Sequence, residues 1–436
     1  MGPYQRVLSW LLLLLVVGCQ GAGGVDRGEV IDTRRGACVL GGLSEAEEVV
    51  IGAIMPLSAP GAAGSGEVMK VAYEIAAEEI NGEGGIGERP LRLVVRDTAG
   101  SPEVGSEVVR DLIENECVAG IVGEYHSAVG LAVNEIAHEY GVPIIFAETY
   151  NDDITAKGYA ETFRIAPTST FTAQMDGKWL AEVGDYNGDG LMLAVVIAED
   201  SSYGEGQIER AETWFPEFGI SLEVIVVGDD FGGVAEAIGA LRHKPDAIFI
   251  KVTGDDSYQV QNVLQAAGLG PNGTSLVVAN QVALQGDAYW EAVPKGAYVV
   301  VPRIGPWATT VTAKGEAFVA KYQAVYDRWP EAYAFEAYDS LWLMADGIER
   351  ANSLVGGEIV AALEETDLEL AAGRYRFPYG SANPAGGYVP EFMWHQWPDV
   401  PLLFVQYTEI GQSPEEMAVI WPSLYRTTET AVIEPK

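Results

Sequence analysis

Basic residues are scarce in this sequence. Its 436 residues include 26 Lys and Arg against 63 Asp and Glu, which gives a formal net charge of −37. Proteins that bind nucleic acid neutralise phosphates with clustered basic side chains, and the sequence has no such cluster. We therefore expect no nucleic-acid partner. An acidic surface keeps a protein well solvated and says little about its fold.

Histidine is also rare, and the familiar catalytic motifs are missing. The four histidines are His126, His138, His243 and His395, and none belongs to a His-Glu-x-x-His zinc motif. The sequence has no Gly-x-Ser-x-Gly nucleophile turn and no P-loop. The sequence therefore contains no residues that are recognisable as catalytic groups for hydrolysis or for redox reactions. We expect a protein that is not an enzyme and that binds no metal or other cofactor.

Two segments that resemble ligand motifs stand in the wrong context. Residues 81–87, NGEGGIG, contain Gly-x-Gly-x-x-Gly, but they follow a helical pattern and precede a strand, the reverse of a dinucleotide site. Residues 185–190, DYNGDG, begin like a calcium loop, yet the position of the bidentate Glu is Val196, inside a strand pattern. We interpret both segments as turns.

The first residues are typical of a signal peptide. The apolar run VLSWLLLLLVV at residues 7–17 follows a basic start and is too short for an ordinary transmembrane helix. Residues 16–19, Val-Val-Gly-Cys, resemble the bacterial lipobox, which implies cleavage before Cys19 and lipidation of its thiol. We expect an extracytoplasmic protein, lipid-anchored to a bacterial membrane. The alternative is an ordinary signal peptide that happens to contain a cysteine.

The segment after Cys19 has the composition of a tether. Residues 20–47 are rich in Gly and acidic, with no sustained period. Two further cysteines, Cys38 and Cys117, each lie just before an expected strand. Outside the cytoplasm they can form a disulfide, and they can equally remain two buried thiols, so both alternatives stay open.

Strand and helix patterns alternate from residue 49 onward. VVIGAIM at 49–55 is an apolar strand, and residues 67–80 have apolar side chains at helical spacing. The alternation begins again after Pro167. Such alternation predicts parallel sheets with helices on both faces, here in two α/β units of similar size.

Ser127 lies where one strand ends and a helix begins. The strand is expected at 118–122, and GEYHSAVG at 123–130 leads into the helical pattern. A serine at this place can cap its own helix, or it can offer its hydroxyl group to an anion bound beside the helix N-terminus.

Several segments together resemble one family, in their order and spacing. They are GAIMPLSAPGAAGSG (52–66), EEINGEGGIGERPLRLVVRDTAGSP (78–102), GEYHSAVGLAVNEIAHEYGVPII (123–145), NDDITAKGYAETFRIAPT (151–168) and EDSSYGEGQ (199–207). The sequence resembles the substrate-binding proteins of branched-chain amino-acid-type ABC transporters, the Leu/Ile/Val-binding proteins. The resemblance covers nearly everything from Val49 to the C-terminus.

This resemblance implies the type I periplasmic binding protein fold, an α/β fold of two doubly wound lobes joined by a three-crossing hinge. The crossings are expected near Pro167, Pro302 and Gly373. The N-terminal lobe then comprises 48–167 plus 303–372, and the C-terminal lobe comprises 168–302 plus 373–436. The ligand is expected between the lobes.

The resemblance also implies ligand-binding residues. In the family, the serine at the place of Ser127 binds the ligand carboxylate, so we expect Ser127 both to cap its helix and to contact the ligand. Tyr203 matches an aromatic residue of the second lobe that faces the ligand. Asp255, with Asp256 beside it, follows the strand pattern FIKVTG, where the family also contacts the ligand.

Three positions depart from the amino-acid binders of the family. Glu148 and Tyr150 occupy places where those proteins usually supply a carbonyl group and a Thr hydroxyl. Gln281 falls where they place a Glu for the ligand ammonium, and an amide cannot supply that charge. Glu148 or Asp255 can compensate. Relatives that bind amides or urea have a Tyr at the same distance from the Ser, which makes an amide-like solute the alternative ligand.

We expect a protein, monomeric itself, that captures a small polar solute, an amino acid or a related compound, and delivers it to the permease subunits of an ABC importer. One alternative is a sensor that reports its ligand to a membrane receptor without transport. Another is an enzyme that uses Glu148 and Asp255 as an acid–base pair, although no nucleophile accompanies these acids.

Overall fold

The computed structural model describes residues 38, 40–228, 230–269, 275–308 and 310–431. The expected signal peptide, its lipidation site Cys19 and most of the tether lie outside the described residues. Cys38 and Cys117 are joined by a disulfide, with their Cα atoms 5.3 Å apart. The bridge fastens the segment before the first strand to the loop that leads into the third strand.

The first sheet has five parallel strands in the order β2-β1-β3-β4-β5. Their bounds are Val49–Met55 (β1), Leu91–Asp97 (β2), Gly120–Gly123 (β3), Ile144–Phe146 (β4) and Thr162–Arg164 (β5). Every residue of β1 is buried. This continuous burial is typical of a parallel strand that is covered on both faces, and it explains the uninterrupted apolar sequence VVIGAIM.

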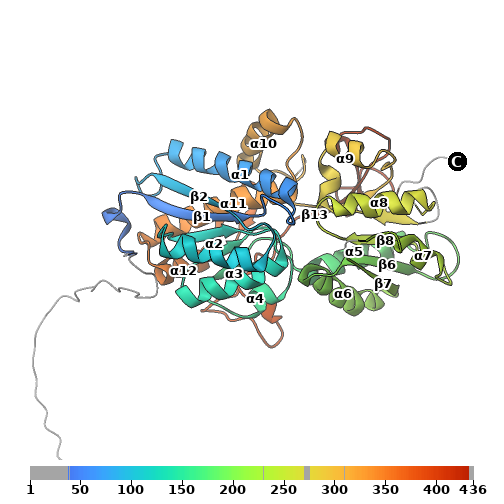
Figure 1. Cartoon of the computed structure of the whole chain (residues 1–436), viewed down its shortest axis with the longest axis horizontal. Helices are drawn as coiled ribbons and strands as arrows, with labels where there is room; N and C mark the ends of the chain where they lie inside the picture. The colour runs from blue at the N-terminus through green and yellow to red at the C-terminus, as the bar shows by residue number, and fades with distance from the viewer. Residues whose placement is uncertain (1–37, 39, 229, 270–274, 309, 432–436) are drawn as a thin grey trace, which may run out of the picture. The chain divides into compact units, whose positions relative to one another are not determined.

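Helices cover both faces of the first sheet (Figure 1). One core cluster includes side chains of α1 and α11, and the other includes side chains of α2 and α3. The helices of this part are α1 (Ala63–Gly82), α2 (Pro102–Glu114), α3 (Ser127–Tyr140), α4 (Asp153–Ala156), α10 (Ala313–Tyr326), α11 (Ala332–Ala351) and α12 (Gly356–Glu364). Helix α11 is almost entirely buried, which agrees with its apolar and aromatic sequence.

The second sheet has seven strands in the order β14-β13-β10-β9-β8-β6-β7. Strands β6 to β10 are parallel to one another, whereas β13 and β14 are antiparallel additions at one edge. The strand bounds are Leu193–Glu199 (β6), Ser221–Val227 (β7), Ala247–Lys251 (β8), Leu276–Val278 (β9), Val300–Ile304 (β10), Leu402–Gln406 (β13) and Ala418–Trp421 (β14). Its helices are α5 (Ser169–Val183), α6 (Ser202–Trp214), α7 (Val234–Gly239), α8 (Asp256–Ala266) and α9 (Asp287–Ala292).

The crossings differ in part from the expected positions. Pro167 lies in the connection between β5 and α5, as expected, but Pro302 lies inside β10, so the second connection starts after Ile304. The chain does not turn to the second sheet at Gly373. Strands β11 (Leu368–Glu369) and β12 (Arg374–Tyr375) form a small hairpin, and the chain joins the second sheet only at β13.

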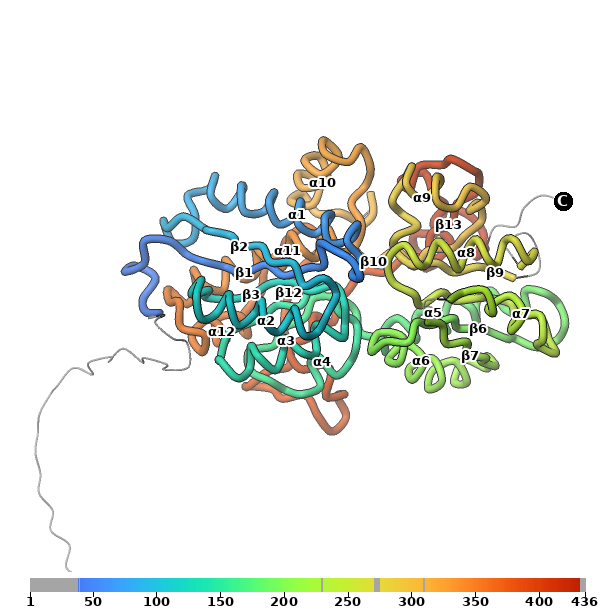
Figure 2. The backbone as a smooth tube through the Cα atoms, viewed as in Figure 1, coloured from blue at the N-terminus to red at the C-terminus, as the bar shows by residue number. Residues whose placement is uncertain are grey.

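The segment between β12 and β13 belongs with the first sheet. Arg164 of β5 donates its N–H to the His395 carbonyl (3.0 Å), and its own carbonyl accepts from Trp397 N–H (2.9 Å). Figure 2 shows this segment passing beside α4, where Thr155 donates to the Phe392 carbonyl (2.6 Å). The reason is the edge of β5, whose backbone groups would otherwise lack partners.

Candidate functional site

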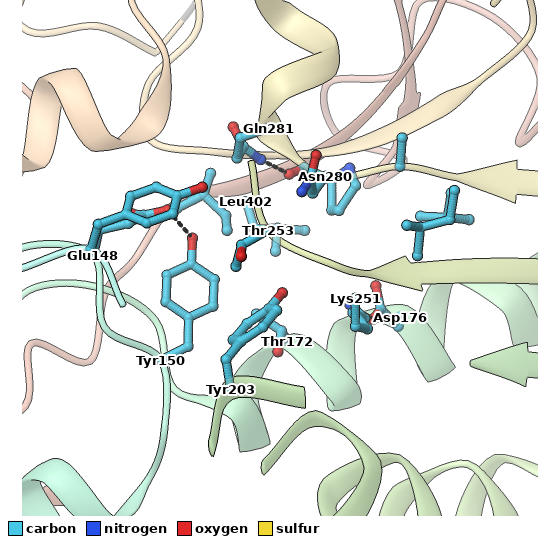
Figure 3. A pocket seen from close by; sticks show the side chains of 16 residues that line it. Glu148, Tyr150, Thr172, Asp176, Tyr203, Lys251, Thr253, Asn280, Gln281 and Leu402 are labelled. Carbon is cyan, nitrogen blue, oxygen red and sulfur yellow. Dashed lines mark hydrogen bonds and ion pairs between the residues drawn. The ribbon is translucent and has the colours of Figure 1, made fainter. Parts of the chain in front are cut away.

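One pocket collects side chains that lie at or just beyond the carboxyl ends of strands in both sheets (Figure 3). Its lining residues are Tyr125, Glu148, Tyr150, Thr172, Asp176, Tyr203, Ile250, Lys251, Thr253, Val278, Ala279, Asn280, Gln281, Pro302, Ile304 and Leu402. Open α/β sheets place their ligands at this end of parallel strands because the loops there are free to vary. Four of the six expected ligand-binding residues, Glu148, Tyr150, Tyr203 and Gln281, line it.

Glu148 and Tyr150 lie together on the loop after β4. The Tyr150 hydroxyl donates to Glu148 Oε1 (3.0 Å), and the Tyr150 ring meets the Tyr203 ring edge-on, with centroids 6.0 Å apart. Glu148 is 8 % exposed, and its Oε2 atom has no hydrogen-bond donor among the described residues. The loop therefore presents the Glu148 carboxyl group next to two aromatic rings.

A second buried carboxyl group interacts with Glu148. Glu336 of α11 is 2 % exposed. Burial raises the pKa of Glu148 to about 7, and burial together with the negative charge of Glu148 raises the pKa of Glu336 well above its ordinary value. Two neighbouring buried carboxylates resist ionising together, so the pair keeps at least one proton near neutral pH.

Gln281 follows β9, at the start of the 3-10 helix η4 (Gln281–Leu284). Its Nε2 atom donates to the Pro302 carbonyl, and its Oε1 atom is buried without a donor among the described residues. Figure 3 draws Gln281 and Asn280 on one side of the pocket, above Thr253. Gln281 thus adds a second free acceptor to the one on Glu148.

Ser127 lies at the start of α3 and bonds a neighbouring loop. It is the first residue of α3, and the N-cap residue, His126, makes no side-chain capping hydrogen bond. The expectation that Ser127 caps its helix is therefore wrong. Its hydroxyl oxygen instead accepts the N–H groups of Tyr150 (3.2 Å) and Asn151 (3.3 Å), because the loop after β4 folds back over the helix start. Ser127 is not among the lining residues and holds the loop that carries Tyr150.

Asp255 lies in another hollow. It is the N-cap residue of α8 and lines a pocket with His126, Thr253 and residues 59–65. Asp255 and Glu148, which were both expected to contact the ligand, line different pockets that share Thr253. Thr253, two residues earlier, is held by Glu199 Oε2 through its N–H (2.6 Å) and its hydroxyl (2.8 Å).

The structure adds two charged residues that the sequence did not single out. Lys251 ends β8, Asp176 lies within α5, and Lys251 Nζ is 2.6 Å from Asp176 Oδ2 in the pocket lining. Burial raises the pKa of Asp176, and the ammonium group of Lys251 opposes this rise. A lysine that directly follows the apolar run AIFI was the available signal.

Arg164 fixes the loop that carries Glu148 and Tyr150. This guanidinium is fully buried and donates to the Asn151 carbonyl (2.5 Å), Thr155 Oγ1 (2.7 Å) and Gln396 Oε1 (2.5 Å). Burial lowers its pKa to about 10. Arg164 thereby connects the site loop to the segment that covers the edge of β5.

The described residues lack two features. Between residues 40 and 431, the gaps aside, no helix has the length and apolar content that a membrane crossing requires. The same residues contain no group of three or more His, Cys, Asp and Glu side chains placed to hold a metal ion.

The periplasmic binding protein family model matches residues 48–385, and the chain belongs to this family. A Leu/Ile/Val-binding protein homolog 7 from Brucella abortus (strain 2308) is 28 % identical over 345 residues, which cover 76 % of this chain and 84 % of the relative. The Leu/Ile/Val-binding protein BraC3 from Rhizobium johnstonii is 24 % identical over 348 residues, 77 % of this chain and 88 % of the relative.

Solved structures share the fold. The LivJ substrate-binding protein of Streptococcus pneumoniae, in complex with isoleucine, aligns with a TM-score of 0.70 at 20 % identity, over 85 % of this chain and 97 % of that one. A solute-binding protein of R. palustris, in complex with benzoate, aligns with a TM-score of 0.69 at 20 % identity, over 89 % and 98 %. The predicted family and the predicted type I periplasmic binding fold are confirmed.

Proposed function

We propose that this protein is an extracytoplasmic solute-binding protein that captures a small polar solute, an amino acid or a related compound, and delivers it to an ABC importer. The observation that carries the proposal is the pocket, whose lining combines side chains from both sheets with buried acceptors and tyrosine rings. The relatives support it, since their names describe Leu/Ile/Val binding and one solved structure contains isoleucine.

The free atoms in the pocket favour a solute that donates hydrogen bonds. Glu148 Oε2 and Gln281 Oε1 are buried acceptors without donors among the described residues. A buried polar atom without a partner costs roughly 1–3 kcal/mol, and a bound ammonium or amide N–H group would remove that cost. Glu148 then supplies the negative charge that Gln281 lacks. An amide or urea-like solute, which Tyr150 favours, remains the alternative within the same proposal.

Attachment and partners form the rest of the proposal. Lipidation at Cys19 would anchor the protein, and the permease subunits of the importer would receive the solute from a monomeric binding protein. A Cys19→Ser chain should move from the detergent phase to the aqueous phase in a Triton X-114 partition if Cys19 carries the lipid. An unchanged partition would contradict lipidation at this residue.

The binding proposal is tested by a thermal-shift screen on the full chain with Cys19→Ser. The panel contains leucine, isoleucine, glutamate, acetamide, urea, putrescine and benzoate. A ligand at about a thousand times its Kd stabilises the folded state by roughly 4 kcal/mol, so binding gives a large shift. An amine or amide that shifts the parent and an exposed-surface control, Glu212→Gln, but not Glu148→Gln, supports the proposal. Shifts by benzoate alone, or by no compound, contradict it.

A further inference from the structure

The pocket has a second polar end, opposite the one formed by Glu148 and Gln281. Figure 3 draws Lys251 and Asp176 beside each other on the far side of Tyr203 from Glu148. Their side chains are 10 % and 2 % exposed, and Nζ and Oδ2 are 2.6 Å apart. The pair comes from two elements, the end of β8 and the middle of α5, so its position depends on the packing of the second sheet.

The lysine in this pair has unused donor capacity. An ammonium group carries three N–H bonds, and among the described residues Lys251 Nζ donates to Asp176 alone. Its other close neighbour is the ring of Phe249, 5.9 Å from Nζ to the centroid. The N–H bonds of Nζ that do not point to Asp176 therefore belong to a buried ammonium group in the lining of the pocket. Charged donors of this kind require acceptors when water leaves the site.

An apolar ligand tail would leave this pair without such acceptors. A branched aliphatic side chain placed against Lys251 and Asp176 would displace water and offer no hydrogen bond in return. A carboxylate or carbonyl oxygen at the same place would accept from Nζ, which also donates to Asp176. The two ends of the pocket therefore offer different hydrogen-bonding groups. Glu148 and Gln281 offer acceptors, and Lys251 offers a donor.

We propose that Lys251 is a specificity-determining residue that binds an acceptor group at one end of the solute, while Glu148 and Gln281 bind a donor group at the other. This inference rests on the proposed function and narrows it. The solute class is one with polar groups at both ends, such as an acidic or amide amino acid or an ω-amino acid. Amino acids with branched aliphatic side chains fit the pocket less well.

Matched pairs of compounds test the inference by isothermal titration of the full chain with Cys19→Ser. The first pair is glutamate and norvaline, and the second is 5-aminopentanoate and pentylamine; one member of each pair lacks the distal carboxylate. The parent should bind the member that has it about 10-fold more tightly or better. Lys251→Met should weaken that binding by about 10- to 100-fold and change the affinity for the other member by less than about threefold.

Asp176→Asn separates a ligand contact from a structural role. This variant removes the ion pair but keeps the ammonium group, so the distal carboxylate should bind as tightly as in the parent or more tightly. A merely structural pair predicts instead that Lys251→Met and Asp176→Asn affect all compounds alike. That result would overturn the role of Lys251 and leave solute binding intact. If no compound of either pair binds the parent, the proposed solute class and this inference are both wrong.

Discussion

The two ends of the pocket hold their charges in opposite ways. At one end, Glu148 and Glu336 bring two buried carboxyl groups together, and burial raises the pKa of both. At the other end, Lys251 and Asp176 form an ion pair of opposite charges. The comparison teaches that removing one charge has opposite consequences at the two ends. At Glu148 and Glu336 it relieves repulsion, whereas at Lys251 and Asp176 it leaves an unpaired charge.

The largest effect is expected when the ion pair is broken. Lys251→Met should lower the free energy of unfolding by roughly 3–5 kcal/mol, because Asp176 is then buried without its partner. The double variant Asp176→Asn/Lys251→Met should recover most of this loss, since neither side chain is charged. Urea denaturation of both variants without ligand gives the two values. A double variant that is as unstable as the single one would show that packing, not charge, explains the loss.

At the pair Glu148 and Glu336, we expect the removal of one charge to raise the free energy of unfolding instead of lowering it. Burial raises the folded-state pKa of Glu148 to about 7. The stability that this group contributes is therefore fully present below about pH 4.5 and is lost as the pH rises through about 7. Burial and the negative charge of Glu148 raise the pKa of Glu336 well above its ordinary value, so Glu336 contributes a loss of the same sign. Glu336→Gln should remove that contribution and raise the free energy of unfolding at pH 8, with little change at pH 4.5.

Denaturation of the parent, Glu336→Gln and the surface variant Glu212→Gln at both pH values measures this difference. Glu212 lies on an exposed face of α6, so its replacement should change neither value. Equal stability of the parent and Glu336→Gln at pH 8 would mean that the two carboxyl groups do not repel each other in the folded protein.

A smaller effect is expected at Gln281, which contributes an acceptor and no charge. Gln281→Leu should weaken binding of an amine or amide solute by about 3- to 10-fold, as one neutral hydrogen bond allows. Gln281→Glu is the matched comparison, because it restores a negative charge and should strengthen binding of an ammonium group. Titration calorimetry with the tightest solute of the screen measures both. Unchanged affinity in both variants would place the solute away from Gln281.

The smallest effect is expected at Asp255. Asp255→Asn should change solute affinity by less than about twofold, because Asp255 lines a different pocket from Glu148. The same titration provides the test, with Glu148→Gln as the variant that should lose affinity. A loss at Asp255 as large as that at Glu148 would mean that the hollow around Asp255 is part of the binding site.

The alternation of strands and helices made the fold predictable, but not the path of the late segment. Apolar strands such as 49–55 and helical spacing at 67–80 indicated the two α/β units directly. The pairing of Arg164 with Gln396 spans 232 positions, and neither side chain has a local pattern that indicates its partner. In particular, an arginine whose guanidinium group is buried cannot be distinguished in the sequence from an arginine that is exposed.

At the site, loop positions were predictable and side-chain directions were not. Glu148, Tyr150, Tyr203 and Gln281 follow strand ends or begin a helix beside them, and the structure places all four in one pocket. Ser127 and Asp255 also lie at such places, but neither lines this pocket. Ser127 accepts hydrogen bonds from the loop after β4, and Asp255 lines a different pocket. The sequence did not predict Lys251 and Asp176 as pocket residues, because a lysine after a strand and an aspartate in a helix are ordinarily exposed to solvent.

The segment along β5 bears on the order in which the molecule can assemble. A chain that emerges N-terminus first presents the edge of β5 before residues 395–397 follow it. The second sheet likewise needs β14, at Ala418–Trp421, to be complete. Both sheets therefore finish near the end of the chain, and a product cut short before residue 395 would carry two open sheet edges available for aggregation.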